Sequence, residues 1–264
     1  MRTSKPEESE VLIQKLRSDM GIHRNPRKGT LNAPEQILGG LELEKKVFVD
    51  EVFPDEFSLE ETQGRIERNT EELLEYDGPV ISIGGDHSVS FPVLKVLKEE
   101  NPDLKLVWLD AHLDLKEKID GHVSHDVVVR ELLDNGFSEE DIVFVGVTRI
   151  DHDERKFLES RDFQIYRPGE VEEFLESRPE GDLYLSVDVD VLKPEEAPGT
   201  GYPDGELDLE KVLEIVNDLR PLHADIVEVA PPFDEESSTV ESAQKVLGSL
   251  VENCGRQKDS GNSF

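Results

Sequence analysis

Short apolar runs alternate with longer amphipathic stretches along the chain. The apolar runs have the length of β-strands and predict strands at 45–52, 79–85, 104–112, 141–147, 163–166, 183–190 and 224–230. Between them, apolar residues recur at three- and four-residue spacing, which predicts helices at 58–75, 88–99, 125–135, 151–160, 169–178, 207–219 and 237–253. Ser58 and Glu61 have the spacing of a capping box at the start of the first helix.

This regular alternation of strands and helices, with strands that are apolar almost throughout, is typical of a parallel sheet covered by helices on both faces. The chain has 264 residues and shows neither an internal repeat nor a linker, so we expect one domain over residues 1–254. The segment 255–264 has no periodicity, and we expect a disordered tail there.

The balance of charge is extreme. The chain has 61 Asp and Glu residues against 29 Lys and Arg residues, a formal net charge of −32, while its hydrophobic content of 36 % is enough for a folded core. The acidic residues form short clusters along the whole chain, which indicates a charged surface. Salt screens such repulsion, so we interpret the protein as adapted to a salt-rich cytoplasm; a merely acidic protein is the alternative. This charge disfavours nucleic acid and anionic membranes as partners.

Other features of the composition agree with a cytoplasmic protein. Apolar runs stay well short of the roughly 18 residues that a membrane helix needs, and the N-terminal segment MRTSKPEESE lacks the apolar core of a signal peptide. Cys254 is the single cysteine, so an internal disulfide is excluded.

The candidate chemistry lies at the ends of four predicted strands, where parallel sheets usually carry their sites. These ends supply side chains that bind metals or transfer protons: His87, Asp110, His112, Asp114, Asp188, Asp190 and Glu228. If the strands continue through these positions, Asp110, His112 and Asp114 point to the same face, as do Asp188 and Asp190.

The charge of these side chains indicates two metal ions. Four converging carboxylates would repel one another and raise one another's pKa, whereas two dications would neutralise them. Carboxylates with one imidazole per ion suit Mn²⁺ better than the cysteine-rich sites of structural zinc. Two such ions would acidify a water for hydrolysis.

Four motifs resemble, in order and spacing, the signatures of the ureohydrolases, the arginase and agmatinase family. They are GGDHS (84–88), DAHLD (110–114), SVDVD with APGTG (186–190 and 197–201) and EVAP (228–231), and GTLNAPEQI (29–37) is similar to the usual opening of that family. The resemblance covers roughly residues 29–250. It implies a three-layer α/β/α fold around an eight-stranded parallel sheet, two Mn²⁺ per chain, and a homotrimer or homohexamer.

The resemblance also implies a role for each motif residue. His87 and Asp114 would bind one ion, His112 and Asp190 the other, and Asp110 and Asp188 would bridge both. Glu228 matches the glutamate that binds the guanidinium group, and His125 the histidine that shuttles protons or contacts substrate; Asp114 would pass a proton to the departing amine. The implied reaction splits a small guanidino substrate into urea and an amine, with agmatine to putrescine, a step of polyamine biosynthesis, favoured.

Departures from the family pattern concern the substrate entrance. Lys193 precedes Pro194 where aspartate is usual, Asp204-Gly205-Glu206 replaces a glycine pair, and Ala230 replaces asparagine. Loop 115–124 lacks the Ser-Gly-Asn run of arginases, which favours an agmatinase.

The alternatives are an arginase, a formimidoylglutamase with the same two metals, or a non-catalytic metal-binding relative. A dicarboxylate substrate would need cations at the rim, for which the candidates are Lys116, Lys118, Arg130, Arg149 and Lys193. His122 could take the place of His125 if the loop is offset, whereas His23, His152 and His223 lie outside the motifs.

The salt-rich interpretation predicts that molar KCl raises the temperature and the urea concentration at which the protein unfolds. The reason is that the distance over which surface charges repel one another falls to roughly 3 Å at about 1 M salt. Thermal and urea unfolding should be followed from 0.05 to 3 M KCl. An unfolding midpoint that does not change with salt would contradict the interpretation.

Overall fold

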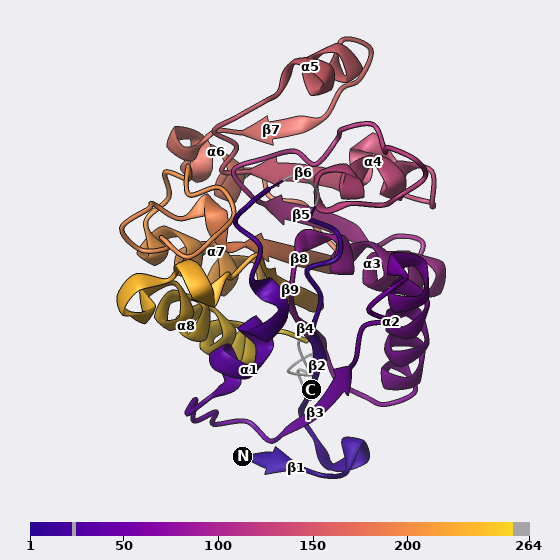
Figure 1. Ribbon diagram of the computed structural model, residues 1–264, viewed down its shortest axis with the longest axis vertical. Helices are drawn as coiled ribbons and strands as arrows, with labels where there is room; N and C mark the ends of the chain where they lie inside the picture. Colours follow the sequence, from indigo (N-terminus) through magenta and orange to yellow (C-terminus); the bar gives the residue numbers. More distant parts are fainter. Residues whose placement is uncertain (23–24, 256–264) are drawn as a thin grey trace, which may run out of the picture.

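The computed structural model of the protein describes residues 1–22 and 25–255. Within them, nine parallel strands form one sheet in the order β1-β3-β2-β4-β9-β8-β5-β6-β7 (Figure 1). The strands are β1 (Arg2–Thr3), β2 (Val11–Leu16), β3 (Val47–Val52), β4 (Val80–Gly84), β5 (Lys105–Leu109), β6 (Ile142–Val145), β7 (Gln164–Tyr166), β8 (Leu183–Asp188) and β9 (His223–Val227).

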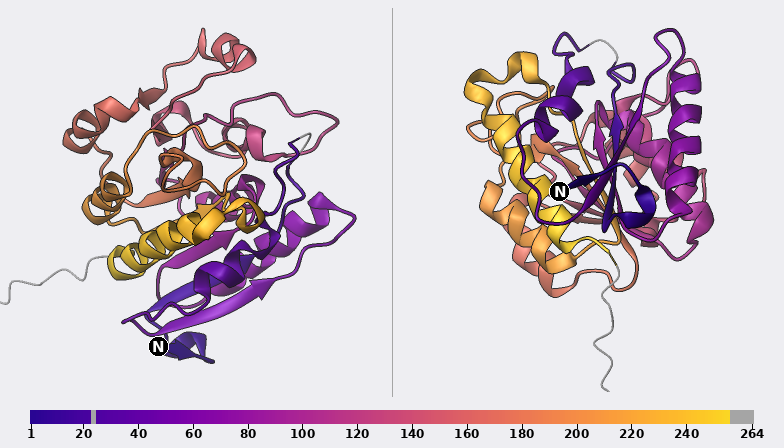
Figure 2. Two further views of the ribbon diagram at one scale, coloured as in Figure 1. Left: turned by 60° about the vertical axis from the view of Figure 1, so that its left-hand side comes forward. Right: turned by 90° about the horizontal axis from the view of Figure 1, so that it is seen from below.

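Helices cover both faces of this sheet (Figures 1 and 2). In Figure 1 the left-hand layer holds α1, α7 and α8, and the right-hand layer holds α2, α3 and α4. The helices are α1 (Ala33–Leu38), α2 (Leu59–Leu74), α3 (Ser90–Glu100), α4 (Val128–Leu133), α5 (His152–Leu158), α6 (Val171–Glu176), α7 (Leu209–Leu219) and α8 (Ser238–Asn253). The predicted α/β fold with a parallel sheet covered on both faces is therefore confirmed.

Two hydrophobic clusters account for the two layers. Along β5, Val107 and Leu109 belong to the cluster with α1, α6, α7 and α8, whereas Leu106 and Trp108 belong to the cluster with α3 and α4. Because side chains alternate along a strand, an uninterrupted apolar run buries residues on both faces of the sheet. These four side chains are fully buried.

Strands β1 and β2 and helix α1 were not predicted. Gln14 and Lys15 interrupt the apolar run of β2, yet Gln14 is fully buried because its amide nitrogen donates to Ser82 Oγ and Thr70 Oγ1. At the start of α2, Ser58 Oγ accepts from the Glu61 amide at 3.1 Å, which is the first bond of the predicted capping box.

The order of strands leaves β4 and β5 apart. The chain passes from β4 to β5 without pairing them, and the later strands β8 and β9 lie between the two. The carboxyl ends of β4, β9, β8 and β5 are thereby neighbours at one edge of the sheet. A reversal of strand order of this kind is where α/β proteins place their ligands.

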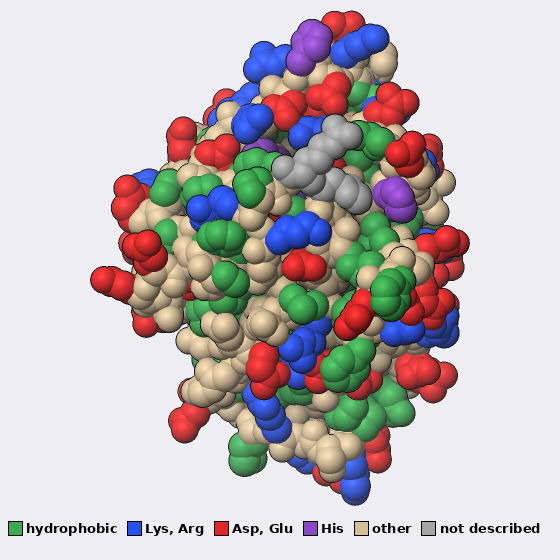
Figure 3. Space-filling model, viewed as in Figure 1, with side chains coloured by type: hydrophobic (Ala, Val, Ile, Leu, Met, Phe, Trp, Pro, Cys, Tyr) green, Lys and Arg blue, Asp and Glu red, His purple; other side chains and the backbone are tan. Residues whose placement is uncertain are grey.

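Acidic side chains are spread over the visible face of the molecule, with Lys and Arg side chains interspersed (Figure 3). This distribution agrees with the scattered acidic clusters of the sequence. Among the described residues, no helix combines the length and the apolar character that crossing a bilayer requires. The predicted tail lies outside the described residues, except for Gly255.

Candidate metal centre

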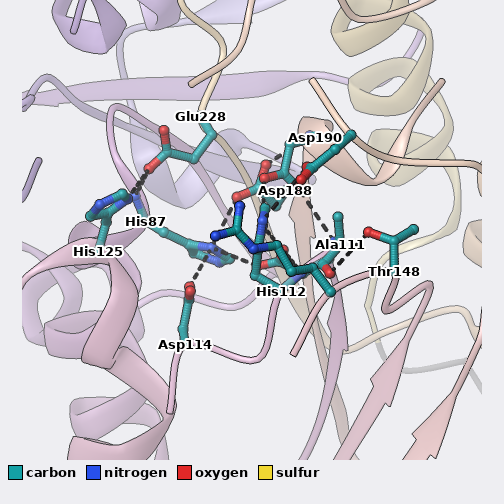
Figure 4. Close-up of polar contacts among 12 residues, drawn as sticks. His87, Ala111, His112, Asp114, His125, Thr148, Asp188, Asp190 and Glu228 are labelled. Carbon is teal, nitrogen blue, oxygen red and sulfur yellow. Dashed lines mark hydrogen bonds and ion pairs between the residues drawn. The ribbon is translucent and has the colours of Figure 1, made fainter. Parts of the chain in front are cut away.

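The residues predicted to carry chemistry converge at the carboxyl ends of the four central strands. Figure 4 shows His87, His112, Asp114, Asp188, Asp190, His125 and Glu228 around one space. The pocket there is lined by His87, His112, Asp114, Lys116, His125, Asp126, Arg149, Asp151, Glu154, Asp188, Asp190, Thr200, Tyr202 and Glu228. Asp110 lies beneath it and contacts both His87 and His112.

Three carboxylates surround one nitrogen of His87. Its Nδ1 lies 3.2 Å from Asp110 Oδ2, 3.3 Å from Asp114 Oδ2 and 3.2 Å from Asp188 Oδ2. The His87 ring stacks on Trp108, with 3.9 Å between ring centroids and 5° between the planes. The imidazole is therefore held with Nδ1 towards the carboxylates.

A second cluster forms around His112. Its Nδ1 lies 2.9 Å from Asp190 Oδ2 and 3.4 Å from Asp110 Oδ1. Asp110 thus directs one oxygen towards each histidine. That is the arrangement expected of a carboxylate bridging two ions.

The spacing of these atoms fits metal ligands better than a network of hydrogen bonds. His87, Asp110 and Asp114 form one group of candidate ligand atoms within 4.8 Å of one another, and Asp110, His112 and Asp190 form another. Adjacent ligands of an octahedral ion with bonds of roughly 2.1–2.2 Å lie about 3 Å apart. Within the described part of the chain, His87 Nδ1 and Asp110 Oδ2 are buried and have no hydrogen-bond partner.

The electrostatics of the cluster also indicate cations. Burial and the neighbouring Asp190 hold the pKa of Asp188 well above its usual range, and burial together with Asp110 raises the pKa of Asp190 to about 7. Burial, with Asp110 again adding to it, raises the pKa of Asp114 to about 6. These carboxyl groups cannot all ionise near neutral pH unless positive charge is placed among them.

The local backbone that presents these side chains differs from the prediction. β5 ends at Leu109 and β8 at Asp188, so alternation along extended strands does not align the acids. Instead, Asp110 Oδ1 accepts from the His112 amide at 2.6 Å and Asp188 Oδ1 from the Asp190 amide at 2.8 Å. Such side-chain turns end a strand and redirect the chain.

Glu228 follows β9 in a strained conformation. Its φ is +64°, in the left-handed region that few non-glycine residues adopt. The carboxylate is buried; Oε1 accepts from the His87 amide at 2.8 Å and lies 3.5 Å from His125 Nδ1 (Figure 4). Burial alone would lower the pKa of His125, but Glu228, Asp114 and Asp126 together outweigh it and raise that pKa to about 9.

The other histidines lie in different environments. His125 begins the 3₁₀ turn His125–Val127 and lines the pocket, whereas His122 is exposed at the tip of loop 115–124 and lines a neighbouring hollow. His152 is exposed, and His223 is buried in β9, where its Nδ1 accepts from the Val80 amide at 2.9 Å. His23 lies outside the described residues.

Several residues at the pocket mouth were not predicted from the sequence. Tyr202 packs against both His112 and His125, with ring centroids 5.5 and 6.3 Å apart. Of the five rim cations considered, Lys116 and Arg149 line the pocket, and both pair with Asp151. Tyr202 directly follows the APGTG motif, and that position is the only signal in the sequence that could have identified it.

The fold and the donor set define an α/β protein with a carboxylate-rich candidate metal centre at the carboxyl edge of a parallel sheet. Comparison with known proteins identifies the family. The model of the Arginase family matches residues 20–252. The chain therefore belongs to the arginase family and is an agmatinase-like hydrolase, in agreement with the resemblance of its motifs.

Relatives and solved structures extend over most of the chain. An agmatinase of Bacillus anthracis is 29% identical over 271 residues, which cover 93% of this chain and 92% of that protein. The human mitochondrial guanidino acid hydrolase is 27% identical over 74% of this chain and 60% of its own length. The structure of a putative agmatinase from Clostridium difficile has a TM-score of 0.83 at 24% identity, over 94% of this chain and 99% of that one, and shows the shared fold.

Asp110 offers the sharpest test of the centre, because it contacts both histidines. We expect wild-type protein to hold two Mn²⁺ per chain and Asp110→Asn to hold one or none after dialysis, since the bridge is lost and the remaining acids are overcrowded. Asp218→Asn removes the same charge from an exposed ion pair of α7 and should keep both ions. Metal analysis by mass spectrometry measures the outcome; two ions retained in Asp110→Asn, or one zinc ion alone in wild type, would contradict the assignment.

Proposed function

We propose that the protein is a binuclear Mn²⁺ hydrolase that splits a guanidino group into urea and an amine, with agmatine as substrate and putrescine as product. The observation that carries the proposal is Glu228. It is a buried carboxylate at the edge of the candidate metal centre, outside both groups of candidate ligands, and it lies in the pocket beside His125.

In this proposal residues 1–254 form the catalytic domain, and the two ions bind to the residues named by the resemblance. His87 and Asp114 would hold one, His112 and Asp190 would hold the other, and Asp110 and Asp188 would contribute to both. When bound, the ions would supply an acidified water and stabilise the charge that develops in the reaction. The carboxylate-rich donors, with one imidazole on each side, suit Mn²⁺.

Glu228 would bind and orient the substrate. A guanidinium group presents parallel N–H donors, and a carboxylate opposite them can accept two charge-assisted hydrogen bonds. Because burial weakens competition from water, such a pair also fixes the position of the central carbon. The strained backbone at Glu228 supports a functional role, since such strain is seldom retained without one.

His125 and Asp114 would change their protonation during the reaction. His125 competes for Glu228 when it is protonated, so the neutral imidazole is the form that releases Glu228 to the guanidinium. Asp114 has a pKa of about 6, high for a carboxyl group, because of burial and the nearby Asp110. In the reaction Asp114 would accept the proton that the attacking water releases and pass it to the departing amine.

The charges at the pocket mouth support a substrate with a cationic tail. Lys116 Nζ lies 3.4 Å from Asp126 and 3.1 Å from Asp151, and Arg149 Nε lies 2.8 Å from Asp151. These cations are already paired, and Glu154 adds a further acid to the lining. An ammonium group suits this rim. The alternative, a guanidino acid or formimino substrate, has a carboxylate tail. To bind that tail, Lys116 and Arg149 would have to leave their present acidic partners.

Assembly and environment complete the proposal. Phe53 and Phe57 are 61% and 94% exposed in the loop between β3 and α2, and apolar side chains of this kind support contacts between copies in a homotrimer or homohexamer. The net charge of −32 supports work in a salt-rich cytoplasm.

Substrate choice tests the proposal directly. Urea release should be measured with agmatine, arginine and 4-guanidinobutyrate in Mn²⁺ and high KCl, and we expect the highest kcat/KM for agmatine. In Glu228→Gln the shape is kept but the charge is lost, so urea production should fall on the order of 10²-fold or more, since about 3 kcal/mol of charged hydrogen bonding is removed. Its metal content should stay at two ions. Loss of the ions would make Glu228 a ligand, and full activity would exclude a guanidinium held there.

Activity should rise with pH from neutral into the alkaline range. The pKa of His125 is about 9, so the imidazole is mostly protonated at neutral pH and becomes neutral, releasing Glu228, as the pH increases. Initial rates between pH 5 and 10 should be compared for wild type and His125→Asn, whose profile should lose this component. A maximum below about pH 6, under the usual histidine pKa of about 6.5, would contradict the role of His125.

A further inference from the structure

Loop 201–206 places Tyr202 in the lining of the pocket. Its end is anchored where the Leu207 amide donates to Val191 O at 3.1 Å and the Lys193 amide to Leu207 O at 2.9 Å. Gly205 lies so close to the preceding turn that a Cβ atom would come within 2.1 Å of Asp190 O.

The loop brings Asp204 to the outer nitrogen of His112. Asp204 Oδ1 lies 3.6 Å from His112 Nε2. This oxygen is buried, although the side chain as a whole is 40% exposed, and among the described residues it has no hydrogen-bond partner. The Asp204 amide donates to Tyr202 O at 2.9 Å, and the Tyr202 ring packs edge-on against His112.

The two ring nitrogens of His112 therefore face different partners. Nδ1 faces Asp190 and Asp110, where an ion would bind, and Nε2 faces Asp204. An imidazole that binds a metal through one nitrogen carries its proton on the other. A carboxylate that accepts this proton fixes the ring and makes it a stronger ligand.

His87 has a different partner at the same position. Its Nε2 lies 2.8 Å from Ser186 Oγ, and that hydroxyl donates to Asp225 Oδ1 at 2.7 Å. The outer nitrogen of His87 thus meets a neutral hydroxyl, whereas that of His112 meets a charged group directly. The two candidate ion sites are unequal for this reason.

We propose that Asp204 is a positioning residue of the metal centre: its carboxylate accepts the Nε2 proton of His112 and selectively raises the affinity for the ion that His112 binds. The inference rests on the two-metal centre of the proposed function. It adds a residue outside the ligand set, and it makes the two ions bind with different strengths.

Stepwise Mn²⁺ binding to the metal-free protein tests the inference. Wild type, Asp204→Asn and Glu206→Gln should be titrated by calorimetry against a competing chelator in high KCl. Glu206 is exposed on the same loop, so Glu206→Gln is a control that removes the same charge two residues away. In Asp204→Asn we expect one of the two binding constants to fall about 10–100-fold and the other to change less than about threefold. Saturating Mn²⁺ should restore urea release because the ligands themselves are intact.

The possible results separate the inference from the proposal beneath it. Two binding constants in Asp204→Asn within about threefold of those in Glu206→Gln, or an equal loss at both sites, would overturn the role of Asp204 and leave the two-metal centre standing. Wild-type protein that binds fewer than two Mn²⁺ would overturn the centre, and the inference with it. If Asp204→Asn fails to fold by circular dichroism, Asp204→Glu, which keeps the charge, should bind both ions as wild type does; selective weakening in that variant would overturn the inference.

Discussion

Repulsion among buried carboxylates is the constraint around which the structure is arranged. Asp110, Asp114, Asp188 and Asp190 are buried close together, with Glu228 beside them. Burial raises the pKa of Asp114, Asp188 and Asp190, and the charges of neighbouring carboxylates add to the effect. Burying these charges together costs free energy of folding, and binding of a positively charged ligand offsets that cost. The cluster lies at an edge of the sheet, where the strands hold it in place.

The strand ends of the sheet hold the mutually repelling side chains in a defined geometry. Each strand end contributes one short segment, and each segment is redirected by its own hydrogen bonds, such as those that Asp110 and Asp188 accept from the backbone. Packing also fixes the positions of these segments. His87 lies flat on Trp108, and Gly85 passes so close to Ser18 O that a Cβ atom would be 1.7 Å away. These hydrogen bonds and close contacts therefore fix where the candidate ligands lie.

Much of the fold and of the candidate site could be predicted from the sequence, because both depend on uninterrupted apolar runs and on motifs of short range. Strand β2 was missed since Gln14 is satisfied by Thr70 and Ser82, which are distant in sequence. The clustering of the acids was predicted for the wrong reason: extended strands were assumed where the backbone turns. Tyr202 and Asp204 could not be assigned, because only the folded loop brings them to His112.

Strands β8 and β9 lie between β4 and β5 although they come last along the chain. On the ribosome, a nascent chain that has reached His112 cannot close its sheet until residues near Glu228 emerge, on the order of ten seconds later at typical rates of synthesis. Until then β4 and β5 present open edges that could pair with another chain.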